Sequence, residues 1–219
     1  MISISESVEK VISRSRYLSE AISKGIINFS ALARYIRPEI EEMTHKDVSE
    51  AALIMALNRL SDHIKPHYKS NEIFEAPPDM MVRSNLAELT VANSVNMNEK
   101  YPLLLKLIDT QGKNFLTITE GVYESTIIAS RDLKDEVVKI LDGETIVAEF
   151  NNLSSITIRL PKSSIHTPGI FYFFIKSLAW EGINIIEIVS AHLELTLIFD
   201  EKDVNKAFSI LQSLFAPQV

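Results

Sequence analysis

The stretch from Ile156 to Phe215 places the strongest constraint on the fold, because its hydrophobic period changes in a fixed order. Apolar and polar residues first alternate, which is typical of a half-buried strand. After Pro168 and Gly169 the period becomes helical, and Gly182 ends that run, since glycine adopts the left-handed backbone of a helix end without a steric clash. Two more alternating segments and a second helical segment follow. The predicted order is β-α-β-β-α, one strand short of a ferredoxin-like β-α-β-β-α-β unit.

An earlier stretch, from Met81 to Phe150, repeats this order and adds the sixth element. Its first strand is followed by a helical segment at Glu99 to Thr110, a hairpin around Gly121, a second helical segment that Gly143 ends, and a closing strand. Because the two first helices lie on the order of seventy residues apart, the pattern indicates a tandem pair of modules. We therefore expect an α+β protein with two ferredoxin-like modules.

The N-terminal part reads as three short helices. The first spans about Ser5 to Lys24, and Asn28 or Ser30 can cap the second. Pro38 falls inside the second segment, where it either breaks the helix or starts a new turn. A capping-box pattern from Asp47 to Glu50 opens the third helix. Three such helices can pack as a helix-turn-helix core, and the segment resembles one of the winged type.

Prolines mark the boundary between the helical part and the modules. Pro66, Pro77 and Pro78 lie among mixed polar residues, which indicates a linker. The predicted domains are a helical domain at 1–68, a linker at 69–82, a first module at 83–151 and a second module at 152–219.

Composition excludes several classes of protein. No apolar run is long enough to cross a bilayer, and no charged and then apolar leader opens the chain. The chain has no cysteine, so disulfides, thiolate metal sites and thiol nucleophiles are excluded, and we expect a cytoplasmic protein. His63 and His67 have Pro66 between them and no third ligand, so we predict no metal site. The net charge of -7 argues against a protein that works mainly by coating itself in nucleic acid.

Three short strings carry a resemblance to a known family. They are Pro168-Gly169-Ile170, then Gly182-Ile183-Asn184-Ile185 after the helix, and then Ile188-Val189-Ser190. Together they resemble the ACT domain, and more narrowly the regulatory ACT pair at the C-terminus of aspartate kinases, over roughly Ser154 to Phe215. The resemblance implies a ligand-responsive regulatory module in which the loop before the first helix and the Gly-Ile-Asn turn lie close together and hold an amino-acid effector.

The predicted ligand site follows from that resemblance and from the chemistry of its residues. A helix N-terminus presents unpaired N–H groups that suit a carboxylate, and an asparagine amide both donates and accepts hydrogen bonds. The alternative is a purely structural role: the loop is a strand-to-helix turn, Asn184 caps the Gly182 turn, and His166 lies on the surface. The predicted ligand-binding residues are Ile165, His166, Thr167, Pro168, Gly169, Ile170, Ile183 and Asn184. The first module has no glycine at Val95 to Lys100, so we expect the site in the second module.

Two surfaces are candidates for partners. In the helical domain, Asn58 and Arg59 lie on the third helix, which would enter the major groove of DNA. The alternative is a helical bundle that docks on the modules or dimerises, and Glu50 and Asp62 favour it because they would repel phosphate. In the second module, the aromatic residues Tyr172, Phe173 and Trp180 predict an interface, either with the helix of the first module or the helical domain, or in a homodimer or higher homo-oligomer.

The sequence predicts no catalysis and no cofactor. It contains no glycine-rich phosphate loop, no Gly-x-Ser-x-Gly elbow and no plausible paired carboxylates. Two functions stay open. The first is an amino-acid-responsive regulatory protein that modulates its helical domain, with DNA as one candidate partner. The second is a regulatory subunit or assembly scaffold for a separate enzyme of amino-acid biosynthesis.

Overall fold

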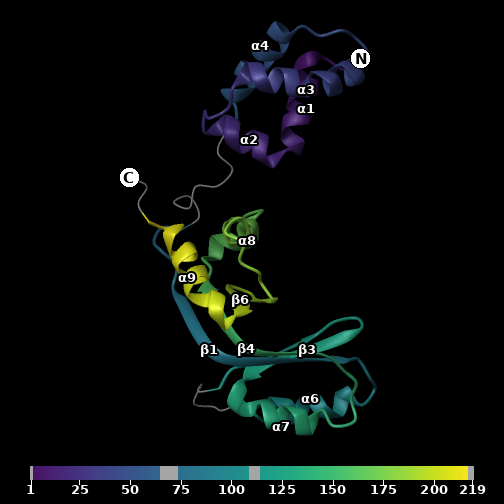
Figure 1. Ribbon diagram of the computed structural model, residues 1–219, viewed down its shortest axis with the longest axis vertical. Coiled ribbons are helices and arrows are strands. Elements are labelled where there is room, and N and C mark those ends of the chain that lie inside the picture. Colours follow the sequence, from purple (N-terminus) through teal and green to yellow (C-terminus); the bar gives the residue numbers. More distant parts are fainter. Residues whose placement is uncertain (1, 65–73, 109–113, 217–219) are drawn as a thin grey trace. The chain divides into compact units, whose positions relative to one another are not determined.

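The computed structural model describes residues 2–64, 74–108 and 114–216. The chain forms two compact units, Met1–Lys69 and Ser70–Val219, here called the helical unit and the sheet unit (Figure 1). Residues 69–73 of the predicted linker lie outside the described residues.

The described part of the helical unit consists of four helices: α1 (Ile4–Arg14), α2 (Arg16–Ser23), α3 (Phe29–Thr44) and α4 (Glu50–Ser61). The single first helix predicted from the sequence is wrong, because the chain turns at Ser15 between α1 and α2. Ser15 has an extended backbone, and its hydroxyl accepts a hydrogen bond from the backbone N–H of Leu18 at 3.4 Å. It therefore ends one helix and caps the next, a role that suits serine better than a helix interior does.

Pro38 lies inside α3 without ending it. The side chain of Pro38 is exposed, and the buried face of the helix (Leu32, Ile36 and Ile40) runs past it. Packing on α1 and α4 thus outweighs the loss of one backbone hydrogen bond. Residues 2–64 contain no strand, so the described part of this unit lacks the β-hairpin wing of the winged helix-turn-helix that the sequence suggested.

The sheet unit contains six strands in the order β2-β3-β1-β4-β6-β5, with every neighbouring pair antiparallel. The strands are β1 (Met80–Ala92), β2 (Leu116–Glu120), β3 (Glu124–Ser130), β4 (Ile146–Arg159), β5 (Glu187–Ala191) and β6 (Glu194–Asp200). The helices are α6 (Met97–Leu105), α7 (Lys134–Ile140), α8 (Ile170–Trp180) and α9 (Val204–Ser213), with 3-10 turns η1 (Arg131–Leu133), η2 (Lys162–His166) and η3 (Glu201–Asp203).

Two long strands join the predicted modules into one sheet. The last strand of the first module and the first strand of the second are halves of β4, which has 14 residues. The strand that the second module lacked in the sequence is the beginning of β1, where Met80–Arg83 pairs with Ser155–Ile158. Met80–Val82 therefore belong to the sheet, whereas the sequence assigned them to the linker. Each half of the sheet thereby has the four strands of a ferredoxin-like unit.

Similar short sequences stand at the middle of both long strands. Asn85–Val91 reads Asn-Leu-Ala-Glu-Leu-Thr-Val, and Asn152–Ile158 reads Asn-Leu-Ser-Ser-Ile-Thr-Ile. Both asparagines have a left-handed backbone, with φ of 61° and 58°, and the register between β1 and β4 shifts beside them. Asparagine tolerates this conformation better than most residues. Beyond each asparagine the strand passes from the edge of one module to the centre of the other, and its side chains become largely buried.

Each module has a core between its helices and the sheet. Figure 1 shows α6 and α7 against the part of the sheet that contains β3. The first core contains Leu89, Val91, Met97, Leu104, Ile127, Ala129, Leu133, Val137 and Leu141. The buried residues of the second module include Ile156, Ile158, Phe174, Leu178, Leu195, Leu197, Ala207 and Leu211. Burial of each of the larger side chains contributes roughly 1.5–3 kcal/mol before the entropic cost of folding.

A third cluster joins the two modules on the other face of the sheet. Leu86, Ile128, Leu153 and Ile198 come from four adjacent strands and are buried together. Antiparallel partners point to the same face, so Glu88, which pairs with Ile128, lies on this face as well. Packing across the module boundary explains why both modules belong to one compact unit.

Candidate functional site

The predicted ligand loop lies between the end of β4 and the start of α8. The strand ends at Arg159, and η2 follows before Thr167 and Pro168 lead into the helix. The backbone of η2 is held from within, since the Ser164 hydroxyl donates to the Pro161 carbonyl at 2.6 Å and the Thr167 hydroxyl donates to the Ser163 carbonyl at 2.9 Å. A short ordered helix therefore stands where the sequence indicated only a loop.

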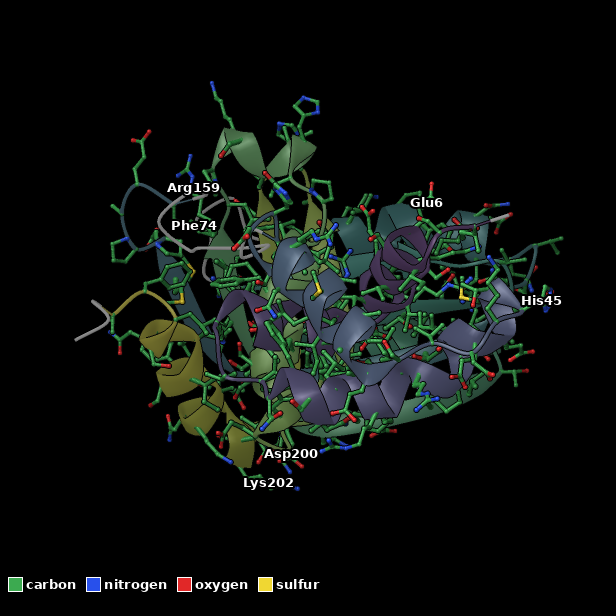
Figure 2. The ribbon with its side chains drawn as sticks, turned by 90° about the horizontal axis from the view of Figure 1, so that it is seen from above. Glu6, His45, Phe74, Arg159, Asp200 and Lys202 are labelled. Atoms are coloured by element: carbon green, nitrogen blue, oxygen red, sulfur yellow. The ribbon has the colours of Figure 1, made fainter. Side chains whose placement is uncertain are left out.

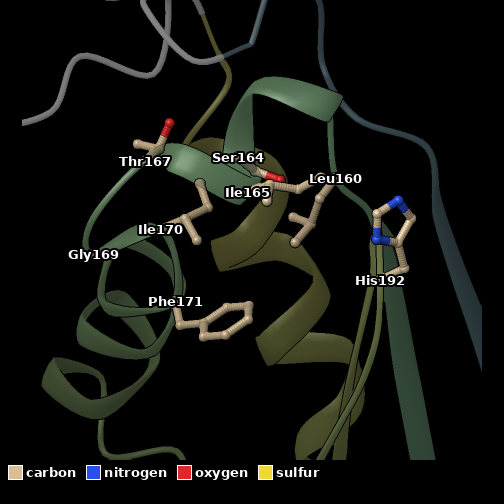
Figure 3. A pocket seen from close by; sticks show the side chains of 8 residues that line it. All are labelled: Leu160, Ser164, Ile165, Thr167, Gly169, Ile170, Phe171 and His192. Atoms are coloured by element: carbon tan, nitrogen blue, oxygen red, sulfur yellow. The ribbon is translucent and has the colours of Figure 1, made fainter.

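A cavity of about 320 Å³ opens at this end of α8 (Figure 3). Its wall is formed by Leu160, Ser164, Ile165, Thr167, Gly169, Ile170, Phe171 and His192. Four of these are predicted ligand-binding residues. In Figure 3, His192, from the turn between β5 and β6, stands across the hollow from Gly169.

Gly169 shapes the polar end of the cavity. It is the N-cap of α8 with φ of 83°, a conformation that favours glycine, and it provides no side-chain cap. The first helical hydrogen bond runs from the Phe173 N–H to the Gly169 carbonyl at 3.1 Å. The N–H groups of the first turn therefore have no acceptor within the helix, and they favour an anion together with the helix dipole. The rest of the wall is mostly apolar, which suits a small molecule with a carboxylate and an apolar part.

The structure does not bring Ile183 and Asn184 to this cavity. They follow the C-terminal end of α8, and a helix of 11 residues is about 16 Å long. Ile183 is buried, its N–H donates to the Leu178 carbonyl at 3.0 Å, and the Asn184 side chain is exposed. The proximity of the two loops that the resemblance implied is therefore not found within this module. His166 and Pro168 are exposed and are not among the residues that form the cavity wall.

The corresponding place in the first module is filled by the protein's own side chains. Before α6, the Ser94 hydroxyl donates to a Glu144 carboxylate oxygen at 2.7 Å, and the Lys100 ammonium lies 2.9 Å from the other oxygen. The side chain of Glu144 is only 3% exposed. Hydrogen bonds from Ser94 and Lys100 hold the pKa of the Glu144 carboxyl below its ordinary value. A carboxylate thus occupies this end of α6, supplied by the chain itself.

Sequence reasoning missed part of the cavity wall. Leu160 and His192 form part of the wall and are not among the residues predicted from the sequence. Strand β6 returns beside β4, and the Leu160 N–H donates to the Leu193 carbonyl at 2.7 Å. The turn before β6 therefore lies next to the end of β4. The signal in the sequence was the hairpin itself, whose turn must lie at that end of the sheet.

The predicted aromatic interface is split by the structure. Phe173 packs inward, with ring centroids 6.5 Å from Phe74 and 6.0 Å from Phe215. Phe173 therefore packs with the second core, which Phe74, from before β1, extends, and its place in the predicted interface is wrong. Tyr172 and Trp180 are 40% and 63% exposed, and the Lys176 ammonium lies 5.4 and 5.2 Å from their ring centres.

The candidate nucleic-acid residues of the helical unit lie on the surface of α4. The Asn58 amide donates to the Ile54 carbonyl of its own helix at 2.9 Å, and Arg59 is exposed. Nearby basic groups are neutralised, since Arg34 pairs with Glu50 at 2.9 Å. These features do not favour a DNA interface. Within the described parts of the chain, no three His, Asp or Glu residues gather as metal ligands, and no helix is long and apolar enough to cross a membrane.

Comparison with solved structures shows that the fold is similar to that of known regulatory domains. The ligand-free regulatory subunit of aspartate kinase from Thermus thermophilus superimposes with a TM-score of 0.51 at 14% identity, over 63% of this chain and 97% of that subunit. The sheet unit has the fold of an aspartate kinase regulatory subunit. Aspartate kinases from Clostridium acetobutylicum and Synechocystis give TM-scores of 0.52 and 0.51 at 14% and 15% identity.

The matches differ in how much of each protein they cover. This chain spans 34% of the Clostridium kinase and 31% of the Synechocystis kinase, with 63% and 76% of its own length aligned. No protein-family profile matches the chain, and no curated protein matches it by sequence. Identities this low establish the likeness of the fold alone.

Proposed function

We propose that this is a non-catalytic regulatory protein whose second module binds a small amino-acid effector at the N-terminus of α8. The observation that carries the proposal is the contrast between the two modules. The open cavity beside Gly169 stands where the first module places its own Glu144 carboxylate against Ser94 and Lys100. The effector's carboxylate would meet the free N–H groups of α8, and its apolar part would pack on Leu160 and Phe171.

Regulation requires that the effector bind two conformations with different affinities. The segment best placed to differ in position between the two conformations is η2. Its residues Ser164 and Ile165 form part of the cavity wall, and hydrogen bonds inside the turn let it move as a unit. We propose that binding stabilises one position of η2 and changes how the helical unit engages its partner. The paired surface charges of α3 and α4 favour a protein partner over DNA.

A second candidate function is a regulatory subunit or assembly scaffold for a separate enzyme. It is favoured by the exposed rings of Tyr172 and Trp180, which flank Lys176 on one face of α8. Aromatic side chains of this kind are enriched at protein interfaces. A homo-oligomer through the same face would use the same residues.

The test is thermal unfolding of the full chain with each proteinogenic amino acid in turn. A ligand that binds only the folded state adds RT ln(1 + [L]/Kd), about 2.7 kcal/mol at a hundredfold excess over Kd. Gly169→Ala should remove the response, because a methyl group at positive φ strains the cap and narrows the cavity. Gly182→Ala is the matched control: it has φ of 71°, open space around it, and lies at the far end of α8.

The outcomes separate the two candidate functions. A midpoint that rises with one or two amino acids in the wild type and in Gly182→Ala, but not in Gly169→Ala, supports the effector site. A midpoint that no amino acid raises would refute it and leave the scaffold, which light scattering of a Trp180→Ala variant then tests through its oligomeric state.

A further inference from the structure

A second cavity, of about 330 Å³, lies next to the first where the chain enters the sheet unit. Its wall includes Phe74, Glu75, Asp79, Arg159, Pro161 and Ser163. Figure 2 labels two of these residues, Phe74 and Arg159, close together in that view. The two cavities share Leu160, and neighbouring residues of η2 contribute to each of them, Ser163 to one and Ser164 to the other.

The charges of this second cavity distinguish it from the first. Arg159 stands between Asp79 and Glu194. The backbone carbonyl of Asp79, the residue before β1, accepts the Arg159 backbone N–H at 3.0 Å, and Glu194 on β6 is the ladder partner of Arg159. Among the described residues, no carboxylate forms an ion pair with the Arg159 guanidinium. The wall therefore presents one cation with the carboxylates of Glu75 and Asp79, beside the apolar surfaces of Phe74 and Pro161.

We infer that this cavity is a second binding site for an α-amino acid, with Arg159 holding the carboxylate and Asp79 or Glu75 holding the ammonium group. A guanidinium binds a carboxylate through two parallel hydrogen bonds, and a carboxylate suits an ammonium group. The cavity at α8 offers N–H groups for a carboxylate, but no acidic side chain for an amine. The inference rests on the proposed function only for the choice of amino acids as ligands.

The position of this site gives it a route to the helical unit along the chain. Phe74 is the first described residue after the helical unit and is 6% exposed. Its ring lies 4.9 Å from that of Phe215 and 6.0 Å from that of Phe174, measured between centroids. An occupant between Phe74 and Arg159 would hold the segment that leads into β1. Because η2 borders both cavities, each occupant would alter the affinity for the other.

The experiment is calorimetric titration of the full chain with the amino acid that raises the unfolding midpoint most. We expect two ligands per wild-type chain. Arg159→Gln should weaken one of the two binding events by about tenfold or more, because it removes the charge that the ligand's carboxylate would pair with. The double variant of Asp79→Asn with Glu75→Gln should do the same, because it removes both carboxylates that could pair with the ammonium group. Arg131→Gln, at an exposed arginine elsewhere on the sheet unit, is the matched control. Circular dichroism checks that each variant is folded.

The outcomes distinguish this inference from the proposed function. One ligand per chain, lost in Gly169→Ala and unchanged in Arg159→Gln, overturns this inference and leaves the proposed function standing. One ligand lost in Arg159→Gln and kept in Gly169→Ala supports the inference and moves the effector site away from α8. No binding by any proteinogenic amino acid overturns both.

Discussion

The loops that precede the first helix of each module occupy the same place in the fold and differ in chemistry. In the first module, Asn93 and Ser94 are hydrogen bonded to Gly121 and Glu144, and Lys100 completes the network. In the second, the Ser164 and Thr167 hydroxyls donate to backbone carbonyls of the same loop, and a cavity lies at Gly169. One helix end is stabilised from within the chain, and the other borders an open cavity, the effector site proposed above.

Under the proposed function, this difference would divide the tasks of two similar modules. A buried carboxylate that accepts bonds from a hydroxyl and an ammonium group adds to folding stability but excludes an external anion. An open helix end gives up that contribution and gains a binding site. Of the two modules, only the second would then respond to an effector.

The largest expected effect comes from opening the first loop. Lys100→Met leaves the nearly buried Glu144 carboxylate without its cation, and the midpoint of thermal unfolding should fall by roughly 5–10 °C. The pKa of Glu144 is lowered in the folded state, so the stability it contributes is present at neutral pH and is lost as the pH falls through that pKa.

Lys134→Met is the matched control, since Lys134 pairs with Glu149 on the same module and that carboxylate is 41% exposed. Its midpoint should change by less than a third of the shift seen for Lys100→Met. Equal shifts for the two variants would mean that the Glu144 network before α6 contributes no more to stability than an exposed ion pair does.

The next effect is a pH dependence of stability caused by Glu88, the one charged residue of the repeated strand sequence. The second module has Ser155 at the equivalent position. Burial raises the pKa of Glu88 to about 7, and the nearby Glu187 carboxylate acts in the same direction. Its folded pKa therefore lies above the ordinary value of 4.5, so stability is lost as the pH rises from about 4.5 through 7.

Glu88→Gln should remove this loss and stabilise the protein above pH 7 by roughly 2 kcal/mol, with little change near pH 4.5. Urea unfolding across that range is the measurement. Glu187→Gln should recover a smaller part of the loss, because it removes only the neighbouring charge. A wild type and a Glu88→Gln variant with the same pH dependence would show that Glu88 does not titrate in this range.

Much of the sheet unit could be predicted from the sequence, because its helices and strands have strong periods and glycines mark several of their ends. The hydrophobic periodicity could not predict which segments join into one strand or which strands pair. Nothing local indicates that Ile146 to Arg159 is one strand, or that Met80–Arg83 completes the distant second module. The repeated asparagine sequence was present, but its meaning depends on pairing between residues about seventy apart, which a local pattern does not encode.

The site was predicted in part for a similar reason. Gly169 and Ile170 lie in one loop, so a motif could identify them. Arg159, Phe74 and His192 come from three other segments that meet only after the sheet has formed. Asn184 was placed near the loop by family resemblance, and the length of α8 separates them. Ser15 ended a helix that its apolar neighbours would have continued, because a hydroxyl cap is not visible in hydrophobic spacing.

A smaller effect tests whether the two long strands bend by the same means. Asn85→Ala and Asn152→Ala should each destabilise the protein by about 1 kcal/mol, because alanine resists the left-handed conformation. Asn85→Gly should be close to neutral. Asn152→Gly should cost slightly more, since the Asn152 side chain accepts a hydrogen bond from Arg131 at 2.9 Å. Urea unfolding that finds both alanine variants neutral would remove the asparagines from the account of the bend.

An effect of similar size concerns a hydroxyl pair that recurs in both modules. The hydroxyl oxygens of Thr90 and Thr126 are 3.1 Å apart in the first module, and those of Thr157 and Thr196 are 2.9 Å apart in the second. Thr157→Val should cost about 1 kcal/mol, because it leaves the nearly buried Thr196 hydroxyl without its partner. The double variant with Thr196→Val should recover most of that loss, since valine favours strands and no polar group is then left unpaired. Valine substitutions at Thr90 and Thr126 should give a similar coupling energy in a double-mutant cycle. A coupling energy in only one module would show that the two threonine pairs have similar geometry but contribute differently to stability.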